Sequence, residues 1–210
     1  MILNTIRSYR QKFVEDFGEL VICSDSKRYW RKEVFPEYKH NRRKGREESS
    51  LDWANIFDII SRVRQEIKEN FPYIVIHEER CEADDIIGTL VHNTQEFGQH
   101  EEVMIVSADH DFKQLQKFKN VSQFSPMTKK AVVEKNPRLY LMEHILKGDA
   151  GDGVPDGGGA DDAPTTESRA RCCAIGGRDG PSTDGATPAG DCPCARVGCG
   201  PDSDEWACLV

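Results

Sequence analysis

Acidic residues stand directly after three short apolar runs of this 210-residue sequence, where they could together bind a metal ion. Two carboxylates about 4 Å apart repel each other by about 4 kcal/mol at an effective dielectric constant of 20, so a bare cluster is unfavourable. No set of His or Cys residues accompanies these oxygen ligands in the sequence, which favours Mg²⁺ or Mn²⁺ over Zn²⁺. The acidic residues are Asp25, Glu82, Asp84, Asp85, Asp109 and Asp111.

Each acidic group also has a simpler interpretation. Asp25 alone could be a turn or cap residue. Glu82 to Asp85 could form the favourable acidic first turn of a helix, and Asp109 and Asp111 could cap the helix that follows them. Their occurrence at three consecutive strand ends favours a joint metal site. Within it Asp85 is the weaker ligand candidate, because it lies about 100° around the helix from Asp84.

A basic segment with interleaved aromatic residues extends over 27–46. Positive charge mixed with stacking rings is what a path for single-stranded nucleic acid requires, although a solvated basic face would have the same composition. A polyanion meets the local charge of a surface, so we expect phosphate binding here despite the net charge of −8. The residues are Lys27, Arg28, Arg31, Lys32, Lys39, Arg42, Arg43, Lys44 and Arg46, with Tyr29, Trp30, Phe35 and Tyr38 between them.

Apolar periodicity predicts the elements that must position these residues. The predicted helices cover 2–17, 50–70 and 83–97, with a fourth beginning at 111, and the predicted strands cover 20–24, 73–77 and 103–107. Strands that alternate with helices imply an α/β fold, with a mostly parallel sheet and helices on both faces. Such sheets carry their sites at the carboxyl ends of the strands, which is where the acidic residues stand.

The composition divides the chain near residue 156. Residues 157–210 contain no Lys, six of the eight Cys, and 9 acidic against 4 basic residues, which leaves a net charge of −3 for residues 1–156. No apolar run approaches the roughly 20 residues that a membrane span needs, which excludes a membrane protein, and no export signal is present at the N-terminus. A cytoplasmic, reducing location fits the two cysteines of the body.

Four ordered motifs over residues 2–156 resemble the flap endonuclease, or 5′ nuclease, family. The first is Asp25-Ser-Lys-Arg-Tyr-Trp-Arg-Lys-Glu, continued by Tyr38-Lys-His-Asn-Arg42. The others are Glu82-Ala-Asp-Asp-Ile-Ile, Ser107-Ala-Asp-His-Asp-Phe-Lys-Gln-Leu and Lys147-Gly-Asp-Ala-Gly-Asp-Gly-Val-Pro155. The resemblance implies a PIN-like α/β sheet, a two-metal acidic site, a helical arch above it and a helix–hairpin–helix element that binds duplex backbone.

The resemblance also implies roles for individual residues. Lys39 and Arg42 match the basic pair of the arch that contacts the scissile phosphate, and they are the catalytic candidates. The implied ligands of two Mg²⁺ ions, for which Mn²⁺ could substitute, are Asp25, Glu82, Asp84 and Asp109 for the first ion and Asp111, Asp149 and Asp152 for the second. The expected nucleic-acid contacts are Lys27, Arg28, Arg31, Tyr38, Arg43, Lys44, Gly148, Gly151 and Gly153.

The sequence departs from the family pattern near both ends. Family members begin with a strand that carries a further aspartate, so we expect a sheet that lacks one strand and a site that lacks one ligand. The expected divisions are a PIN-like domain at 1–146, a truncated helix–hairpin–helix start at 147–156 and a Gly/Cys-rich tail at 157–210. We expect the tail to be a frame-shifted or misassembled extension without packed structure. The alternatives are a native disordered tail and a metal module of Cys192, Cys194, Cys199 and Cys208.

The implied function is metal-dependent phosphodiester hydrolysis by a 5′–3′ exonuclease or flap endonuclease, including removal of RNA primers in DNA replication. One ion would activate water for in-line attack and the other would stabilise the leaving oxygen. Substrates would be branched or nicked DNA and RNA–DNA duplex with a free 5′ end, in a phage or bacterial host cytosol, with a sliding clamp or single-strand-binding protein as partner. The alternatives are a truncated nucleic-acid-binding fragment of weak activity and a PIN-type RNA endonuclease.

Overall fold

The computed structural model describes residues 2–96, residues 100–156 and the backbone of residues 206–209. Helices and strands alternate along most of this length. In chain order the elements are α1 Ile2–Phe17, β1 Glu19–Cys23, α2 Arg31–Val34, α3 His40–Glu47, α4 Trp53–Asn70, β2 Ile74–Ile76, α5 Ala83–Gln95, β3 Val103–Val106, the 3₁₀ helix η1 Asp111–Lys117, β4 Val121–Ser125, β5 Lys130–Val132, α6 Pro137–Lys147 and β6 Trp206–Leu209.

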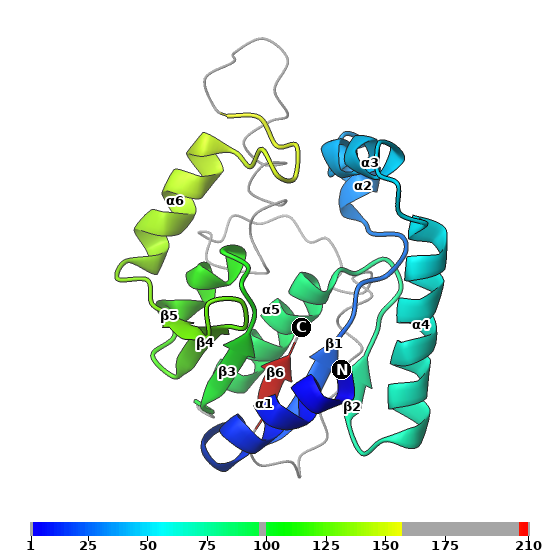
Figure 1. Ribbon diagram of the computed structural model, residues 1–210. Coiled ribbons are helices and arrows are strands. Elements are labelled where there is room, and N and C mark those ends of the chain that lie inside the picture. Colours follow the sequence, from blue (N-terminus) through cyan, green and yellow to red (C-terminus); the bar gives the residue numbers. More distant parts are fainter. Residues whose placement is uncertain (1, 97–99, 157–205, 210) are drawn as a thin grey trace, which may run out of the picture.

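A six-stranded sheet with the order β2-β1-β6-β3-β4-β5 forms the centre of the fold. Every neighbouring pair is parallel except β4 and β5, which are antiparallel. Helix α1 packs on one face, and α5 and η1 pack on the other (Figure 1). The predicted α/β architecture, a mostly parallel sheet with helices on both faces, is confirmed.

Strand β1 shows why its sequence is a continuous apolar run rather than an alternating one. Leu20 packs in a cluster with Phe13 of α1, whereas Val21 and Cys23 pack in a second cluster with Ile87 of α5. Successive side chains of a strand point to opposite faces, so burial on both faces requires an apolar residue at every position. Packing in the two clusters fixes the position of the end of β1, and therefore the position of Asp25 shortly after it.

Helix α4 is less buried than its sequence pattern suggests. Its periodicity places Phe57, Ile60 and Ile67 on one stripe, yet only Ile67 is buried, and Phe57 and Ile60 are 43% and 54% exposed. The reason is that α4 lies beside the edge strand β2 rather than across the sheet (Figure 1). Among the described residues, no helix is both long and apolar enough to cross a membrane.

Strand β6 differs from the expectation of a tail without packed structure over residues 206–209. Its backbone lies between β1 and β3 and is parallel to both, with Glu19 opposite Trp206 and Ile105 opposite Cys208. Two strands separated by the width of one strand leave unpaired N–H and C=O groups on both sides of the gap, which a strand from elsewhere in the chain can pair. The rest of the tail, including the suggested cysteine module, lies outside the described residues.

Candidate active site

The carboxyl ends of β1 and β3 open onto a cleft of about 580 Å³. In Figure 1 this end of the sheet lies between α6 with its following loop on one side and α2 and α3 on the other. Six of the seven expected metal ligands line the cleft, together with both catalytic candidates. The charged and aromatic lining residues are Asp25, Lys39, Arg42, Asp84, Asp109, His110, Asp111, Tyr140, His144, Asp149 and Asp152.

Asp25, Asp84 and Asp109 form the first group of carboxylates. Asp25 follows β1, and its Oδ1 accepts a hydrogen bond from the backbone N–H of Ala83 at 2.7 Å, which ties this strand end to the start of α5. Burial, and next the negative charge of Asp109, raise the pKa of Asp84 to about 7, with a smaller contribution from Asp25. These side chains therefore repel one another, which is the arrangement that a bound cation would relieve.

Glu82, the seventh expected ligand, lies behind the cleft. It is 3% exposed, and its Oε1 accepts from the Lys39 ammonium at 2.6 Å. Its Oε2 accepts from the Tyr38 hydroxyl at 3.0 Å and faces the Arg31 guanidinium at 3.1 Å. Both oxygens are thus engaged by protein groups, and these contacts hold the 31–39 segment against α5.

Arg31 and Tyr38, which we expected among the nucleic-acid contacts, are buried in this structure. Arg31 donates to Asp85 Oδ2 at 2.7 Å, and Tyr38 donates to Asp152 Oδ2 at 2.8 Å. Burial, followed by the charges of Glu82 and Asp152, raises the pKa of the Tyr38 hydroxyl, so it remains a donor. These contacts position the segment beneath α3 and leave neither side chain a surface for a base or phosphate. The carboxylate of Asp85, the weaker ligand candidate, is paired with the Arg31 guanidinium.

Lys39 and Arg42 reach the cleft from the start of α3. Lys39 has a left-handed backbone (φ 57°), and its backbone N–H donates to Asp152 O at 2.8 Å. Burial acts to lower the pKa of the Lys39 ammonium, but contact with Glu82 and the charge of Asp152 raise it above its usual value, so it stays charged. Arg42, with a side chain 54% exposed, donates to Asp152 Oδ1 at 2.6 Å.

The loop after α6 places Asp149 and Asp152 at the cleft. Asp149 and Val154 exchange two backbone hydrogen bonds of 2.8 and 2.7 Å that close this loop. Gly148 (φ 68°) is required at its base, because a Cβ there would overlap the backbone of Val154 and Pro155. Gly153 (φ 75°) also has the left-handed conformation that favours glycine. Gly148 and Gly153, which we expected to contact phosphate, therefore also provide backbone conformations that the loop itself uses.

The N–H of Gly151, also expected to contact phosphate, donates to Asp149 Oδ1 at 2.7 Å. The remaining basic candidates are exposed. Arg43 forms an exposed ion pair with Glu47 along α3 at 2.8 Å. Lys27 and Arg28 lie before α2 and Lys44 lies on α3, so all four basic side chains can meet a polyanion from solution.

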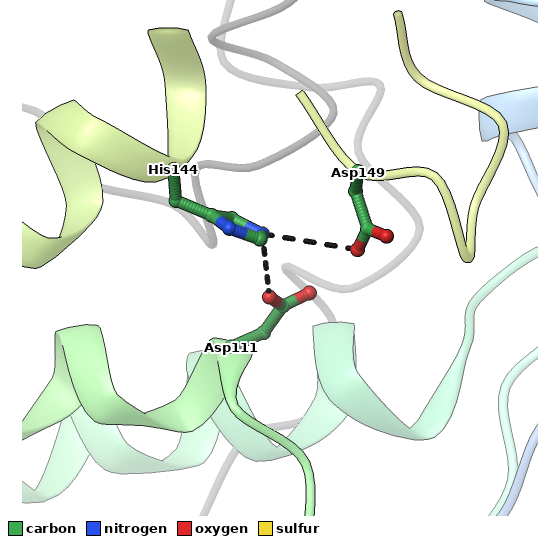
Figure 2. A group of neighbouring side chains, drawn as sticks. All are labelled: Asp111, His144 and Asp149. Carbon is green, nitrogen blue, oxygen red and sulfur yellow. Dashed lines mark ion pairs between the residues drawn. The ribbon is translucent and has the colours of Figure 1, made fainter. Parts of the chain in front are cut away.

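His144 is a cleft residue that the sequence interpretation missed. Figure 2 shows its ring between Asp111 and Asp149, with Nε2 3.1 Å from Asp111 Oδ1 and 3.8 Å from Asp149 Oδ2. The contact with Asp111 is the largest cause of a raised pKa at His144. The sequence interpretation considered only oxygen ligands here, because it found no set of His or Cys ligands beside the aspartates. The available signal was Asn136-Pro137, a helix start that predicts α6 and its inward-facing residues.

A mostly parallel α/β sheet with clustered carboxylates at its strand ends, beneath short basic helices, defines a PIN-like fold. Residues 1–138 match the family model of the 5′-3′ exonuclease N-terminal resolvase-like domain, and the chain belongs to that family. It is 41% identical over 160 residues to Ribonuclease H of Enterobacteria phage T4, covering 73% of this chain and 52% of the relative. The resemblance to the 5′ nuclease family is therefore confirmed.

A 5′-3′ exonuclease of Buchnera aphidicola is 30% identical over 161 residues, which cover 73% of this chain and 53% of that protein. The chain thus spans about half the length of these two relatives. Among solved structures, the flap endonuclease of bacteriophage T5 in a complex with DNA and metal ions is similar with a TM-score of 0.61. That match has 22% identity and covers 76% of this chain and 61% of the other, and it supports the PIN-like fold.

Proposed function

We propose that this chain is the catalytic part of a metal-dependent 5′ nuclease, which hydrolyses phosphodiester bonds near free 5′ ends in DNA and RNA–DNA duplex. The observation that carries the proposal is the convergence of six aspartates with Lys39 and Arg42 on one cleft. Membership of the 5′-3′ exonuclease family supports the same reaction class. Removal of RNA primers, cytoplasmic location and partnership with a sliding clamp or single-strand-binding protein would follow from this activity.

The carboxylates fit two divalent cations. Asp25, Asp84 and Asp109 would hold one, and a cation there would offset the burial and the neighbouring negative charge that raise the pKa of Asp84. Asp111 and Asp149, with Asp152 on the same loop, would hold the other. Mg²⁺ is the cation proposed for the first position, since oxygen ligands suit it and Mn²⁺ can replace it. When bound, such ions supply Lewis acidity toward a phosphate and lower the pKa of water.

The basic side chains at the cleft would stabilise charge on the phosphate during hydrolysis. Arg42 is free to turn from Asp152 toward a phosphate oxygen, because an exposed ion pair contributes only about 0–1 kcal/mol. Lys39 is more firmly held by Glu82 and would act from its present position. The sugar–phosphate backbone of the substrate would be bound by the exposed Lys27, Arg28, Arg43 and Lys44. Such contacts hold the nucleic acid without recognising its base sequence.

The test is cleavage of three 5′-labelled substrates by the full chain in Mg²⁺: a flapped duplex, a nicked duplex and single-stranded RNA. We expect cleavage near the 5′ end of the flap and the nick, and loss of cleavage when EDTA is added. Preferred cleavage of single-stranded RNA would instead identify a PIN-type RNA endonuclease. Binding of the flap without cleavage of any substrate would identify a nucleic-acid-binding fragment. Either result would contradict the proposal.

A further inference from the structure

We propose that His144 is a ligand of the second cation position, together with Asp111 and Asp149, and that it gives this position a preference for a transition-metal cation such as Mn²⁺ over Mg²⁺. The inference builds on the proposed function, since it concerns the second of two cation positions. The three residues come from η1, from α6 and from the loop after α6. One potential ligand atom of each lies within 4.8 Å of the others.

The separations suit a shared ion. Ligand atoms at adjacent positions of an octahedron, about 2.1 Å from the metal, lie about 3.0 Å apart. The distance from His144 Nε2 to Asp111 Oδ1, 3.1 Å, is close to that value, and the distance to Asp149 Oδ2, 3.8 Å, is somewhat longer. Figure 2 shows both carboxylates directed at the same nitrogen. The three atoms therefore lie close enough together to share one cation.

The nitrogen itself has the properties of a ligand atom. Nε2 of His144 is buried, and among the described residues it has no hydrogen bond of acceptable geometry despite the nearby carboxylates. The two carboxylates pair with this nitrogen only when the imidazole is protonated. A cation bound among the three groups would take the place of that proton, because a histidine ligand must be neutral at the coordinating nitrogen. The direction of Nε2 toward both carboxylates marks the imidazole as part of the site.

Neighbouring groups hold the three side chains in place. Asp149 Oδ1 accepts backbone hydrogen bonds from Gly151 at 2.7 Å and Asp152 at 3.3 Å, so Oδ2 is the oxygen left to face His144. The His144 ring stacks on Tyr140, with ring centres 5.8 Å apart and an angle of 11° between the planes. Such supporting contacts orient a ligand before the metal arrives, which lowers the cost of binding.

The chemistry of the donor set gives the preference. Mg²⁺ takes oxygen ligands in a near-ideal octahedron, whereas a site that contains imidazole nitrogen binds first-row transition metals, most weakly Mn²⁺ and more strongly the later ones. The group formed by Asp25, Asp84 and Asp109 offers only oxygen. The two positions of this cleft are thus chemically different, and a mixed occupancy, with Mg²⁺ at the first and a transition metal at the second, is the expected resting state.

Mn²⁺ is the probe that tests this directly, because the eight cysteines of the chain would complicate the use of Zn²⁺. Pulsed EPR of the Mn²⁺-loaded full chain should show modulation by a histidine nitrogen. His144→Asn should abolish this signal and lower the Mn²⁺-over-Mg²⁺ affinity ratio by about tenfold or more. His144→Asp should still bind divalent cations, without the nitrogen signal and without the preference. The matched control is His40→Asn, an exposed histidine on α3 that should change neither quantity.

Persistence of the nitrogen signal in His144→Asn would overturn the inference. The inference would also be overturned if the unaltered chain bound Mn²⁺ without a nitrogen signal, and Asp149→Asn abolished that binding. Thermal unfolding of each variant without metal shows whether it is folded. Cleavage of the flap substrate in Mg²⁺ separates the two proposals: a nitrogen signal without cleavage contradicts only the proposed function, and cleavage without a nitrogen signal contradicts only the role of His144.

Discussion

Asp84 illustrates how a single residue reports on the site around it. Its carboxyl lies in the first turn of α5, mostly buried, with Asp109 and Asp25 close enough to raise its pKa to about 7. An isolated structural carboxylate in a helix N-terminus would instead be stabilised in its charged form. The unfavourable environment of Asp84 therefore favours the metal interpretation over the simpler one of an acidic first turn.

Asp84→Asn should have opposite effects on activity and on stability. Loss of a proposed ligand should lower flap cleavage by at least about 10²-fold while flap binding is largely retained. In EDTA at pH 8 the same change should raise the midpoint of thermal unfolding, because it removes charge repulsion at a half-buried group. Asp58→Asn, which alters an exposed carboxylate paired with Arg62 at 2.6 Å, is the control and should do neither. Unchanged cleavage by Asp84→Asn would refute its assignment.

Lys39 and Arg42 should be distinguishable by stability. Lys39→Ala removes a cation from the buried Glu82 and should lower the free energy of unfolding by about 1–3 kcal/mol as well as slowing cleavage. Arg42→Ala should slow cleavage with a stability change of only about 0–1 kcal/mol, since its ion pair is exposed. Urea unfolding and single-turnover cleavage at fixed salt measure the two quantities. If both variants lost binding and rate equally, these residues would serve binding alone.

At the scale of elements, the loop after α6 is the part whose backbone is most constrained. It brings Asp149 and Asp152 to the cleft and is bound to the start of α3 through the hydrogen bond from Lys39 N–H to Asp152 O. Asn41 also donates to Ala150 O, at 3.3 Å. The two sides of the cleft are therefore joined at this point, and the loop geometry sets the relative positions of the carboxylates and the basic pair.

Gly148→Ala should destabilise the chain by about 2 kcal/mol or more, because it combines a left-handed backbone with direct overlap on the following turn. The matched control is Gly45→Ala in the middle of α3, where an added Cβ meets no atom within 4 Å. That change should stabilise the helix by about 0.5–1 kcal/mol. Chemical denaturation of both variants checks the pair, and a similar small effect in each would show that the loop is not constrained as described.

For the whole molecule, β6 determines whether the sheet is continuous. It is the neighbour of both β1 and β3, so it connects the two strands whose carboxyl ends carry Asp25 and Asp109. Without a strand at this place, the backbone groups of β1 and β3 that face the gap would lack partners. The separation between Asp25, after β1, and Asp109, after β3, thus depends on a segment far away in the sequence.

Truncation after residue 205 should lower the free energy of unfolding by several kcal/mol, since each lost hydrogen bond contributes about 0.5–1.5 kcal/mol. Hydrogen exchange should increase at the amides of β1 and β3 and should change little in α6. A chain shortened only by Val210, which lies outside the strand, is the control. Unchanged exchange in β1 and β3 would show that β6 does not hold the sheet together in solution.

Local patterns in the sequence were sufficient for most of the fold and for much of the site. The helix at 2–17 was predicted to the residue, and the strands ending at Cys23 and Val106 were predicted within one or two residues, because two-face burial leaves continuous apolar runs. Residues that directly follow such strands, such as Asp25 and Asp109, necessarily share one edge of a parallel sheet. Short-range spacing and sheet geometry together therefore predict the carboxylate cleft.

Only the tertiary structure decided which charged groups face one another. Arg31 and Tyr38 belong to a basic, aromatic segment typical of a surface, yet they are buried against Glu82, 44 or more residues away. His144 meets Asp111 because α6 folds back over η1, and nothing local to either residue encodes that approach. Residues 206–209 complete the sheet for a similar reason. Burial leaves a periodic pattern of apolar residues in the sequence. The pairing of charges and of strand edges leaves no such pattern, because it depends on contacts between residues far apart in the chain.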